Sequence, residues 1–384
     1  MIPACILATA THCHLGNHAV QHCAALRQPP TPPDTVYRRV GTQQEPIPCK
    51  LLSGTPLAQA DTRLMQGIEA IITQVLTAAG LPSQHRRQLA LFLGSSSFDI
   101  SVSEQAYQQA RDVRGDAIPM GGGSSSFGNL ADRLSQQFDW HGPVFSFNTA
   151  CTSSANALWY ATRWLTAGHA DYALVLGVEV FNDMTALGFQ SLGLLTPAVM
   201  KPFDVHRNGL VLGEAISALL LGPGTAAHFR ILGGANLCDT HSMSAANPDG
   251  STVKQVVQDA LSAAHLRPAG IGLIKVHGTA SLLNDEAEAS GLLQVFDALP
   301  PICALKPFLG HTLGACGAAE TALLWQTLTA ATPFIPATPG IGADPAVLGL
   351  ALTQQASSPT AGATLLNFFG FGGNNTALIM GTTA

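Results

Sequence analysis

Strand-like and helix-like patterns alternate along most of this chain, and the alternation limits the folds it can adopt. Short apolar runs predict strands at residues 89–96, 142–149 and 170–179, and apolar residues at helical spacing predict helices at 62–80 and 155–168. Parallel strands need a crossover connection, which is usually a helix. The order therefore predicts an α/β fold, with a mainly parallel sheet and helices on its faces.

The second half of the chain repeats this order, which predicts an internal duplication. After a strand near residues 228–237, helices and strands alternate, and two strands flanking a GFGG turn close the chain. We therefore expect two related halves, residues 1–222 and 229–384, joined by a short linker. The predicted helices of the second half are 251–266, 285–296 and 314–331, and the strands between them are 272–278 and 302–306.

The chain carries little charge for its length. Of its 384 residues, 47% are hydrophobic and 11% are charged, against roughly 25% charged residues in typical soluble domains. So much apolar sequence implies either a large interior or a face that is buried against another subunit. The net charge is −6, without a run of basic residues, which argues against a nucleic-acid partner and against a polybasic membrane-binding segment.

No segment predicts a membrane span or a secretory leader. The most apolar candidate, residues 209–222, is short and contains Glu214, so we expect a buried pair of strands there. The first residues lack the basic region of a signal peptide. The eight cysteines are scattered without a CxxC pair. That distribution is typical of a reducing compartment, and we predict a cytoplasmic location.

One cysteine, Cys151, stands in the stretch FNTACTSSANALWYA (147–161), where a strand pattern turns into a helix pattern. A helix N-terminus carries a partial positive charge and unpaired N–H groups. Both stabilise a thiolate, so we expect a lowered pKa and raised reactivity at Cys151. The same N–H groups could hold an oxyanion. The alternative is an inert core cysteine, and the residues alone leave it open.

Two histidines of the second half lie, like Cys151, at the ends of predicted strands or directly before a predicted helix. His277 stands at the end of a predicted strand, and His311 lies in a small-residue loop directly before a predicted helix. In open α/β sheets, reactive groups collect beyond the carboxyl ends of the strands. The alternative for each histidine is a hydrogen-bonded, buried imidazole. The glycine-rich turn at 368–376 would let the backbone approach a ligand, and it lacks the pattern of a phosphate-binding loop.

A cluster of histidines and cysteines near the N-terminus raises the question of a metal site. On a helix, His18 and His22 would share one face, as in some zinc sites. No ligand set with structural-zinc spacing accompanies them, so we expect no metal, with the side chains solvated or packed. The cluster consists of His12, Cys13, His14, His18, His22 and Cys23.

Five segments together resemble the β-ketoacyl synthases of the thiolase superfamily, and they occur in that family's order. The resemblance spans roughly residue 89 to the C-terminus. It implies a thiolase-like fold, in which duplicated βαβαβαββ halves form a five-layered αβαβα sandwich. The segments are TACTSS (149–154), PFDVHRNGLVLGEA (202–215), HGTASLLNDEAE (277–288), KPFLGHTLGACGAAE (306–320) and NFFGFGGNN (367–375).

The resemblance implies a 3-oxoacyl-[acyl-carrier-protein] synthase. An acyl chain would pass from acyl carrier protein to Cys151, and a malonyl group on the carrier protein would then lose CO2 and attack the acyl thioester. A thiolate suits this role because it both attacks a thioester and leaves readily. No bound cofactor is implied, since the substrates are carried on the phosphopantetheine of acyl carrier protein. The implied partners are that carrier protein and a second subunit, in a homodimer or in a heterodimer with a chain-length-factor-like subunit.

The resemblance also implies roles for individual residues. His277 and His311 match the pair that hydrogen-bonds the enolate formed on decarboxylation, and the backbone N–H groups of Cys151 and Phe371 match the oxyanion donors. The other matching positions are Lys306 and Glu320, which would orient the histidines, Thr279 and Ser281, which would contact the phosphopantetheine arm, and Phe371 with Gly372, which would border the substrate where relatives have a gate.

The sequence departs from the family's pattern at several positions. Ala280 and Ser281 stand where many relatives have glycine and threonine, and the serine keeps the hydroxyl. Leu282 stands where proline is common. Leu210 replaces a frequent aromatic residue, which could reshape the mouth of the pocket, and Asn374 replaces a threonine.

Two other functions on the same fold are alternatives. A thiolase-like acyltransferase generally needs a further C-terminal cysteine, and none follows Cys316. A non-elongating partner subunit of a ketosynthase heterodimer typically lacks the nucleophile that Cys151 would provide. Within the family, the motifs are closer to aryl-polyene synthases than to general type II fatty-acid synthases. Residues 119–134 lie where relatives line the acyl tunnel, with an ordinary loop as the alternative.

Overall fold

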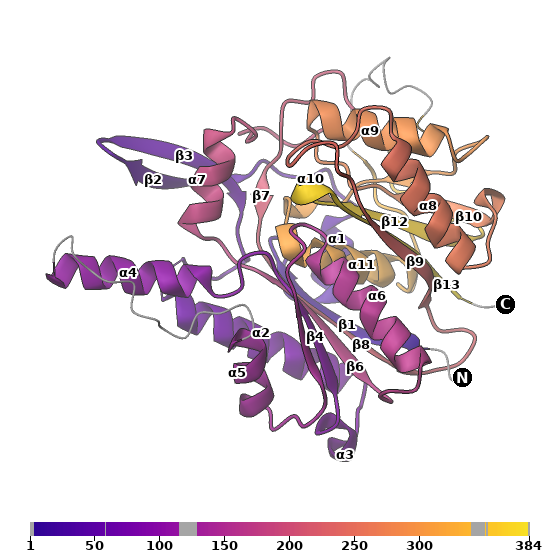
Figure 1. Ribbon diagram of the computed structural model, residues 1–384, viewed down its shortest axis with the longest axis horizontal. Helices are drawn as coiled ribbons and strands as arrows, with labels where there is room; N and C mark the ends of the chain where they lie inside the picture. The colour runs from indigo at the N-terminus through magenta and orange to yellow at the C-terminus, as the bar shows by residue number, and fades with distance from the viewer. Residues whose placement is uncertain (1–3, 58, 115–128, 339–349, 351, 383–384) are drawn as a thin grey trace.

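The structure, a computed structural model, describes residues 4–57, 59–114, 129–338, 350 and 352–382. Of the segment expected to line an acyl tunnel, residues 119–128 lie outside the described residues. Within this part of the chain, ten strands form one sheet in the order β11-β10-β12-β13-β9-β1-β8-β6-β4-β5 (Figure 1). These strands are β1 (Ala4–Cys13), β4 (Ala90–Gly94), β5 (Val144–Phe147), β6 (Ala173–Glu179), β8 (Ala215–Pro223), β9 (Arg230–Cys238), β10 (Ile271–Lys275), β11 (Ile302–Cys303), β12 (Ala363–Phe369) and β13 (Asn374–Gly381).

The two ends of the sheet repeat one arrangement. In one, β4 pairs in parallel with β5 and β6, β6 runs antiparallel to β8, and β8 runs antiparallel to β1. In the other, β10 pairs in parallel with β11 and β12, β12 runs antiparallel to β13, and β13 runs antiparallel to β9. The two sets meet where Cys5 of β1 pairs with Arg230 of β9. The expected duplication is confirmed.

The sheet is mixed, so the expectation of a mainly parallel sheet is wrong. Within this ten-stranded sheet of the described residues, the four pairs that β4 and β10 make are parallel, and the other five pairs are antiparallel. The strands β12 and β13 are joined by the short turn at residues 370–373, which cannot make a crossover, so they run antiparallel. The equivalent strands β6 and β8 keep the same antiparallel pairing.

Helices α6 (Ser153–Thr166) and α11 (Cys316–Leu328) pack against each other in the middle of the molecule (Figure 1). Along β6, Ala173 and Val175 belong to this central core, whereas Leu174 and Leu176 belong to the core beneath α2 (Ala60–Ala78). Helices α8 (Ser251–Ala263) and α9 (Leu282–Leu293) cover the outer face of the other half. The two halves of the sheet, which meet at β1 and β9, thus lie on either side of α6 and α11 as two layers, and the expected helix–sheet–helix–sheet–helix sandwich is confirmed. Strands buried on both faces explain the continuous apolar runs of the sequence.

Residues 209–222 form two buried strands, as expected, but these two strands do not pair with each other. β7 (Leu212–Gly213) pairs in parallel with β3 (Gln43–Lys50), which forms a hairpin with β2 (Asp34–Val40), whereas β8 enters the large sheet. Glu214 separates β7 from β8. Its buried carboxylate is held by the guanidinium of Arg63 and by the backbone N–H groups of Leu52 and Phe181. These contacts direct the chain from the small sheet into the large one.

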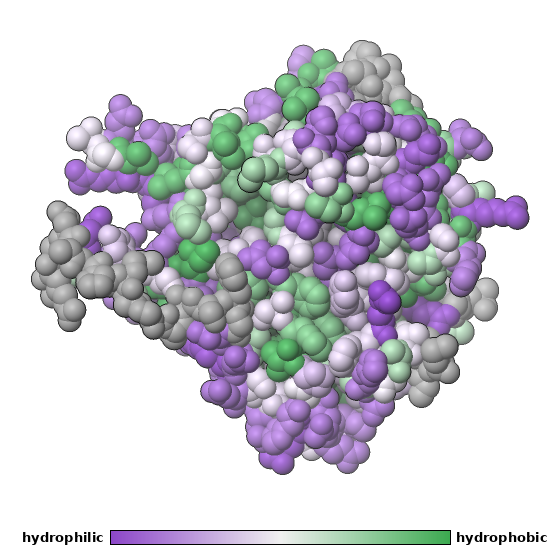
Figure 2. Space-filling view, viewed as in Figure 1, coloured by the Kyte–Doolittle hydropathy of each residue, from purple (hydrophilic) through white to green (hydrophobic). Residues whose placement is uncertain are grey.

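Several elements were not predicted from the sequence. Figure 1 shows two of them, the β2–β3 hairpin and α4, extending from the body on the side away from α8. Hydrophilic side chains gather over α8 and α9 and around α3 (Figure 2). Within the described ranges, no helix has the length and apolar character needed to cross a membrane. The remaining α-helices are α1 (Ala19–Ala25), α3 (Ser83–Arg86), α4 (Ile100–Arg114), α5 (Asn129–Gln137), α7 (Asp183–Ser191) and α10 (Lys306–Leu309).

Candidate active site

Cys151 lies at the turn between β5 and α6, beyond the carboxyl ends of β4, β5 and β6. After β5 ends at Phe147, Ala150 takes a left-handed backbone conformation (φ 51°) that reverses the chain. The Ser153 hydroxyl holds the turn: it donates to the Ala150 carbonyl at 2.6 Å and accepts the N–H of Thr149 at 3.0 Å. Cys151 is thereby fixed two residues before α6 begins, with its side chain only 5% exposed.

His311 faces the sulfur of Cys151. Its Nε2 lies 3.1 Å from Sγ, and its Nδ1 accepts the backbone N–H of Leu313 at 3.3 Å. Because Nδ1 is an acceptor, the neutral ring carries its proton on Nε2 and directs it toward the sulfur. Two hydrogen bonds fix the backbone of His311: its N–H donates to the Val211 carbonyl at 2.7 Å, and its carbonyl accepts the N–H of Gly213 at 2.9 Å.

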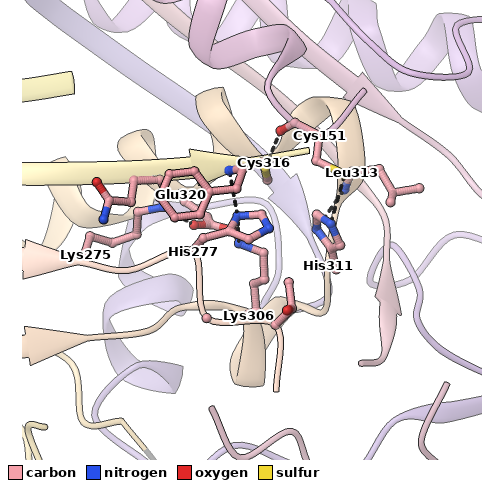
Figure 3. Close-up of polar contacts among 12 residues, drawn as sticks. Cys151, Lys275, His277, Lys306, His311, Leu313, Cys316 and Glu320 are labelled. Atoms are coloured by element: carbon pink, nitrogen blue, oxygen red, sulfur yellow. Dashed lines mark hydrogen bonds and ion pairs between the residues drawn. The ribbon is translucent and has the colours of Figure 1, made fainter. Parts of the chain in front are cut away.

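His277 lies beside His311 (Figure 3). Its Nδ1 accepts the backbone N–H of Phe369 at 3.2 Å and the ammonium of Lys306 at 3.3 Å. The ring proton is therefore on Nε2. The centroids of the His277 and His311 rings are 5.4 Å apart, and the rings are nearly perpendicular at 87°. Two neutral N–H donors thus stand next to Cys151.

Both imidazoles remain neutral at neutral pH. Burial lowers the pKa of His277 and of His311 well below the ordinary value, and the positive charge of Lys306 acts in the same direction. A neutral imidazole can donate a hydrogen bond to an oxygen on which negative charge develops. Prearranged donors of this kind stabilise an enolate or a tetrahedral oxyanion without reorganising during the reaction.

Lys306 and Glu320 lie together behind the histidines. The Nζ of Lys306 is 2.7 Å from Oε1 of Glu320, and a second lysine, Lys275, places its Nζ 2.6 Å from Oε2. All three side chains are fully buried. Burial is the largest single influence on Lys306 and opposes its charged form, but the acidic groups around it, Glu320 first among them, together raise the pKa of Lys306. Sequence reasoning missed Lys275, although a lysine inside an apolar strand was a signal for it.

Two acidic side chains of α9 fix the loop that carries His277, and sequence reasoning gave neither of them a role. Glu288 accepts the backbone N–H groups of His277 at 2.8 Å and Gly278 at 3.0 Å. Asp285 accepts the N–H groups of Thr279 at 3.1 Å and Phe203 at 2.7 Å, and burial raises its pKa to about 7. The available signal was their spacing of three residues within HGTASLLNDEAE, which places both on one face of a helix.

The thiol of Cys151 does not have the lowered pKa that its place before a helix predicted. Burial raises the pKa of Cys151 to about 12; the positive charge of Lys306 and the backbone N–H of Phe371 act in the opposite direction without compensating. The physical reason is that the sulfur is enclosed by neighbouring chain and lies two residues before the first residue of α6. The resting side chain is therefore a thiol, and the donors around it act once negative charge develops.

A cavity of about 380 Å³ brings Cys151, His277 and His311 together. Thr279 and Ser281 also line it, and their hydroxyl oxygens are 2.9 Å apart. The rest of the wall is mostly apolar. Lys306 and Glu320 lie behind this wall rather than in it. The apolar residues that line the cavity include Phe189, Leu194, Leu210, Met243, Leu282 and Phe369.

Phe371 borders the cavity from the turn between β12 and β13. Its ring stacks on Phe189 of α7, with centroids 5.5 Å apart and an interplanar angle of 10°. Gly370 lets this turn approach the nucleophile, because a Cβ atom at Gly370 would lie 3.0 Å from the backbone nitrogen of Cys151. Gly372 is not part of the cavity lining; with a φ of 76°, it donates its N–H to the carbonyl of Met243 at 2.7 Å and anchors the turn.

The N-terminal histidines and cysteines are dispersed around β1 and α1. His22 is buried, with Nδ1 2.8 Å from Oε1 of Gln326 and Nε2 3.1 Å from the carbonyl of Gly16, so both ring nitrogens are engaged. His18 is exposed and caps the start of α1. Among the residues whose positions the structure gives, no group of three or more His, Cys, Asp or Glu side chains is placed to hold a metal ion.

Two family models match consecutive parts of the chain. The N-terminal domain of β-ketoacyl synthase matches residues 58–227, and the C-terminal domain matches residues 228–340. Among curated relatives, the chloroplastic 3-oxoacyl-[acyl-carrier-protein] synthase II of Arabidopsis thaliana is 29% identical over 265 residues, which are 64% of this chain and 48% of that protein. Polyketide synthase ThaG of Burkholderia thailandensis is 32% identical over 251 residues, which are 61% of this chain and 4% of that protein. The chain thus spans less than half the length of these two relatives.

Solved structures match over the whole chain. A complex of the ketosynthase ApeO with its chain length factor ApeC from Xenorhabdus doucetiae contains a chain that is 28% identical, with a TM-score of 0.86 and coverage of 100% of this chain and 98% of that chain. A β-ketoacyl synthase from Burkholderia phymatum STM815 is 25% identical, with a TM-score of 0.83 and full coverage of both chains.

Proposed function

The chain belongs to the β-ketoacyl synthase family, and from that premise we propose that it is a condensing acyltransferase. The reaction joins an acyl chain on Cys151 to the enolate of a malonyl thioester and gives a 3-oxoacyl product two carbons longer. One observation carries the proposal: His277 and His311, both neutral with the proton on Nε2, share a cavity with the sulfur of Cys151.

In the first half-reaction, the sulfur of Cys151 attacks the carbonyl carbon of an acyl thioester. The tetrahedral oxyanion accepts hydrogen bonds from the backbone N–H groups of Cys151 and Phe371. Both N–H groups already favour negative charge on the neighbouring sulfur of Cys151. The carbonyl reforms, the carrier thiolate leaves, and the proton lost by Cys151 passes to it. The acyl group is then held as a thioester on Cys151.

In the second half-reaction, a malonyl thioester enters the same cavity and its bond to the carboxylate carbon breaks. CO2 departs, and the electron pair moves to the thioester oxygen as an enolate. The Nε2–H groups of His277 and His311 donate to that oxygen, while Lys306 holds His277 in the required tautomer. The enolate carbon attacks the acyl thioester, and Cys151 leaves as a thiolate that takes up one proton from water.

We propose that both substrates arrive on the phosphopantetheine of acyl carrier protein. Thr279 and Ser281 line the cavity with hydroxyl groups suited to amides of that arm, and Leu282 and Met243 extend the apolar lining. The similarity to a chain from a ketosynthase–chain length factor complex favours a synthase that works with a second subunit. From the resemblance of its motifs, we propose the aryl-polyene type as its pathway.

We also propose a division of labour between the two halves. Residues 1–222 supply the nucleophile, and residues 229–384 supply both histidines and the GFGG turn that carries Phe371. The site lies where α6 of one half meets α11 of the other. Close approach supports this division: a Cβ atom at Gly317 of α11 would lie 2.0 Å from the backbone nitrogen of Ala155 of α6.

The test is an assay with acyl-carrier and malonyl-carrier protein, with and without candidate partner subunits. Intact-mass spectrometry follows the acyl adduct on the protein, and CO2 release and 3-oxoacyl product are measured in parallel. The proposal predicts an adduct on Cys151, CO2 and product. The absence of all three, even with partner subunits added, would overturn it.

A thiolase-like acyltransferase and a non-elongating partner subunit are the alternatives. A thiolase needs a second cysteine in the active site, and Cys316 is the cysteine nearest to His311 in the chain. Its thiol donates to the carbonyl of Cys151 at 2.9 Å and does not line the cavity, which disfavours a thiolase. A non-elongating subunit has no use for an intact Cys151 flanked by two neutral imidazoles.

A further inference from the structure

A second buried lysine, Lys275, contacts the machinery behind His277 without touching the cavity. Lys275 is the last residue of β10, two residues before His277. Its Nζ donates to Oε2 of Glu320 at 2.6 Å and to the carbonyl of Asn367 at 2.7 Å, and it lies 3.6 Å from the centroid of the Phe368 ring. These three partners match the three protons of an ammonium group.

Two lysines share the carboxylate of Glu320, and this sharing determines where the protons of Lys306 are directed. Lys275 occupies Oε2 of the carboxylate, and Lys306 occupies Oε1 at 2.7 Å. The remaining contact of Lys306 is the Nδ1 of His277 at 3.3 Å. If neither oxygen of Glu320 were bonded to Lys275, the carboxylate could accept two hydrogen bonds from the ammonium group of Lys306. With Oε2 taken, Lys306 keeps a proton directed at His277.

Other charged or titratable groups reach His277 from α10, from the loop after it and from α9. Lys306 comes from α10 and His311 from the loop after it, whereas Cys151, before α6, contacts His311. Glu288 of α9 binds the backbone N–H of His277 and receives the side-chain amide of Asn367. After burial, the positive charges of Lys306 and Lys275 are among the causes that lower the pKa of His277. Lys275 therefore acts on the imidazole both by contact through Glu320 and by its charge.

We propose that Lys275 is a positioning residue for the decarboxylation step. It holds Glu320 so that Lys306 keeps His277 in the tautomer that points Nε2–H into the cavity. This inference rests on the proposed function and adds to it a residue that the substrate never contacts.

The test compares the Lys275→Met variant with the wild type and with Lys50→Met. Lys50 is another buried lysine, bonded to Thr31 and Pro32 and outside the cavity lining, so it controls for the loss of a buried ammonium. In Lys275→Met, acylation of Cys151 should stay within about threefold of wild type, while CO2 release falls at least about tenfold. The acidic limb of the CO2-release profile should move to higher pH, because a neighbouring positive charge has been removed.

A double variant checks the route through Glu320. If Lys275 acts through the carboxylate, Lys275→Met has little further effect on CO2 release in a Glu320→Gln background. Should the methionine variant fail to fold, Lys275→Gln, which keeps a polar group and removes the charge, carries the same comparison. CO2 release at the wild-type rate, or equal loss of acylation and CO2 release with an unmoved acidic limb, overturns the inference. A wild-type protein that neither takes up an acyl group nor releases CO2 overturns the proposed function instead.

Discussion

The rings of His277 and His311 stand nearly perpendicular, with centroids 5.4 Å apart, and each accepts a backbone N–H at Nδ1. This common feature fixes both as Nε2–H donors. They differ in distance from the nucleophile, because only the Nε2 of His311 is within hydrogen-bonding distance of the sulfur of Cys151, at 3.1 Å. Their contributions to the two half-reactions can therefore be separated.

Replacing His277 should spare acylation and remove condensation. We expect His277→Ala to form the acyl adduct on Cys151 but to lower CO2 release and product formation about 10²–10³-fold, the usual cost of one oxyanion donor. Intact-mass spectrometry measures the adduct and product analysis measures the condensation. His228→Ala, an exposed histidine between the two halves, serves as the control and should match the wild type. Normal condensation by His277→Ala would refute the enolate assignment.

The acyl adduct should depend on Cys151 and not on its neighbour Cys316. Cys151→Ala removes the nucleophile, so we expect no adduct with any acyl-carrier substrate. Cys316→Ala removes a thiol that donates to the carbonyl of Cys151 at 2.9 Å, and the adduct should persist. Peptide mapping by mass spectrometry locates the label. An adduct in Cys151→Ala would place the acyl group on a different residue.

Much of this site was predictable because its groups stand at the ends of elements with strong patterns. Cys151 and His311 each lie between an apolar strand or loop and a long helix, and the predicted helices 155–168 and 314–331 correspond to α6 and α11. Lys275 was not predicted as part of the site because its partners come from α11 and β12. Contacts between elements far apart in the sequence leave no local sequence pattern. The pKa of Cys151 was misjudged for a related reason: helix position is visible in sequence, but the degree of enclosure is not.

The fold was predictable in its layers and less so in its pairings. Alternating apolar patterns gave the strands and helices, but strand direction depends on connections such as the turn at residues 370–373. The β2–β3 hairpin went unpredicted because Pro46 and Pro48 interrupt β3, and prolines weaken a strand pattern. Residues 209–222 were expected to form two buried strands, and they do, but the pairing partners of these strands, in two different sheets, could not be predicted from the charge of Glu214 that separates them.

A side chain at Gly370 should lower the rates of both half-reactions, because the backbone at Gly370 lies close to that of Cys151. A methyl group at Gly370 would lie 3.0 Å from the backbone nitrogen of Cys151, so Gly370→Ala should displace the Phe371 N–H by a few tenths of an ångström. We expect acylation and condensation to fall together, by about 10–100-fold, less than the loss of a whole donor. Gly188→Ala in α7 has open space around the added methyl group and should retain activity. Equal activity of the two variants would remove Phe371 from the oxyanion site.

The buried ion pair of Arg63 and Glu214 should matter for stability. Glu214 is 1% exposed and Arg63 5% exposed in their side chains, and the carboxylate also binds two backbone N–H groups. Arg63→Met would leave the buried carboxylate uncompensated, so we expect the free energy of unfolding to fall by about 3–5 kcal/mol. Arg133→Met breaks an exposed pair with Asp61 and should cost less than about 1 kcal/mol. Urea unfolding measures the free energy of unfolding of both variants and of the wild type. Equal losses in the two variants would contradict the expectation.

The buried neutral imidazoles should make stability depend on pH. In the unfolded chain a histidine has its ordinary pKa of about 6.5, whereas the folded pKa of His277 lies well below that value because of burial and the Lys306 charge. Below about pH 6.5 the unfolded state therefore binds a proton that the folded state does not, and the free energy of unfolding decreases. Asp285 acts oppositely, since burial raises its pKa to about 7 and the folded state takes up its proton first.

A His277→Gln variant isolates one imidazole from these opposing groups. Glutamine cannot be protonated, so the contribution of His277 is absent in the variant while that of Asp285 is shared. The stability of the wild type relative to the variant should fall by roughly 1 kcal/mol between about pH 7.5 and pH 5.5. Urea unfolding of both proteins across this range measures the difference. A difference that stayed constant would mean that His277 takes up its proton in the folded protein too, and the neutral Nε2–H donor on which the decarboxylation depends would not exist.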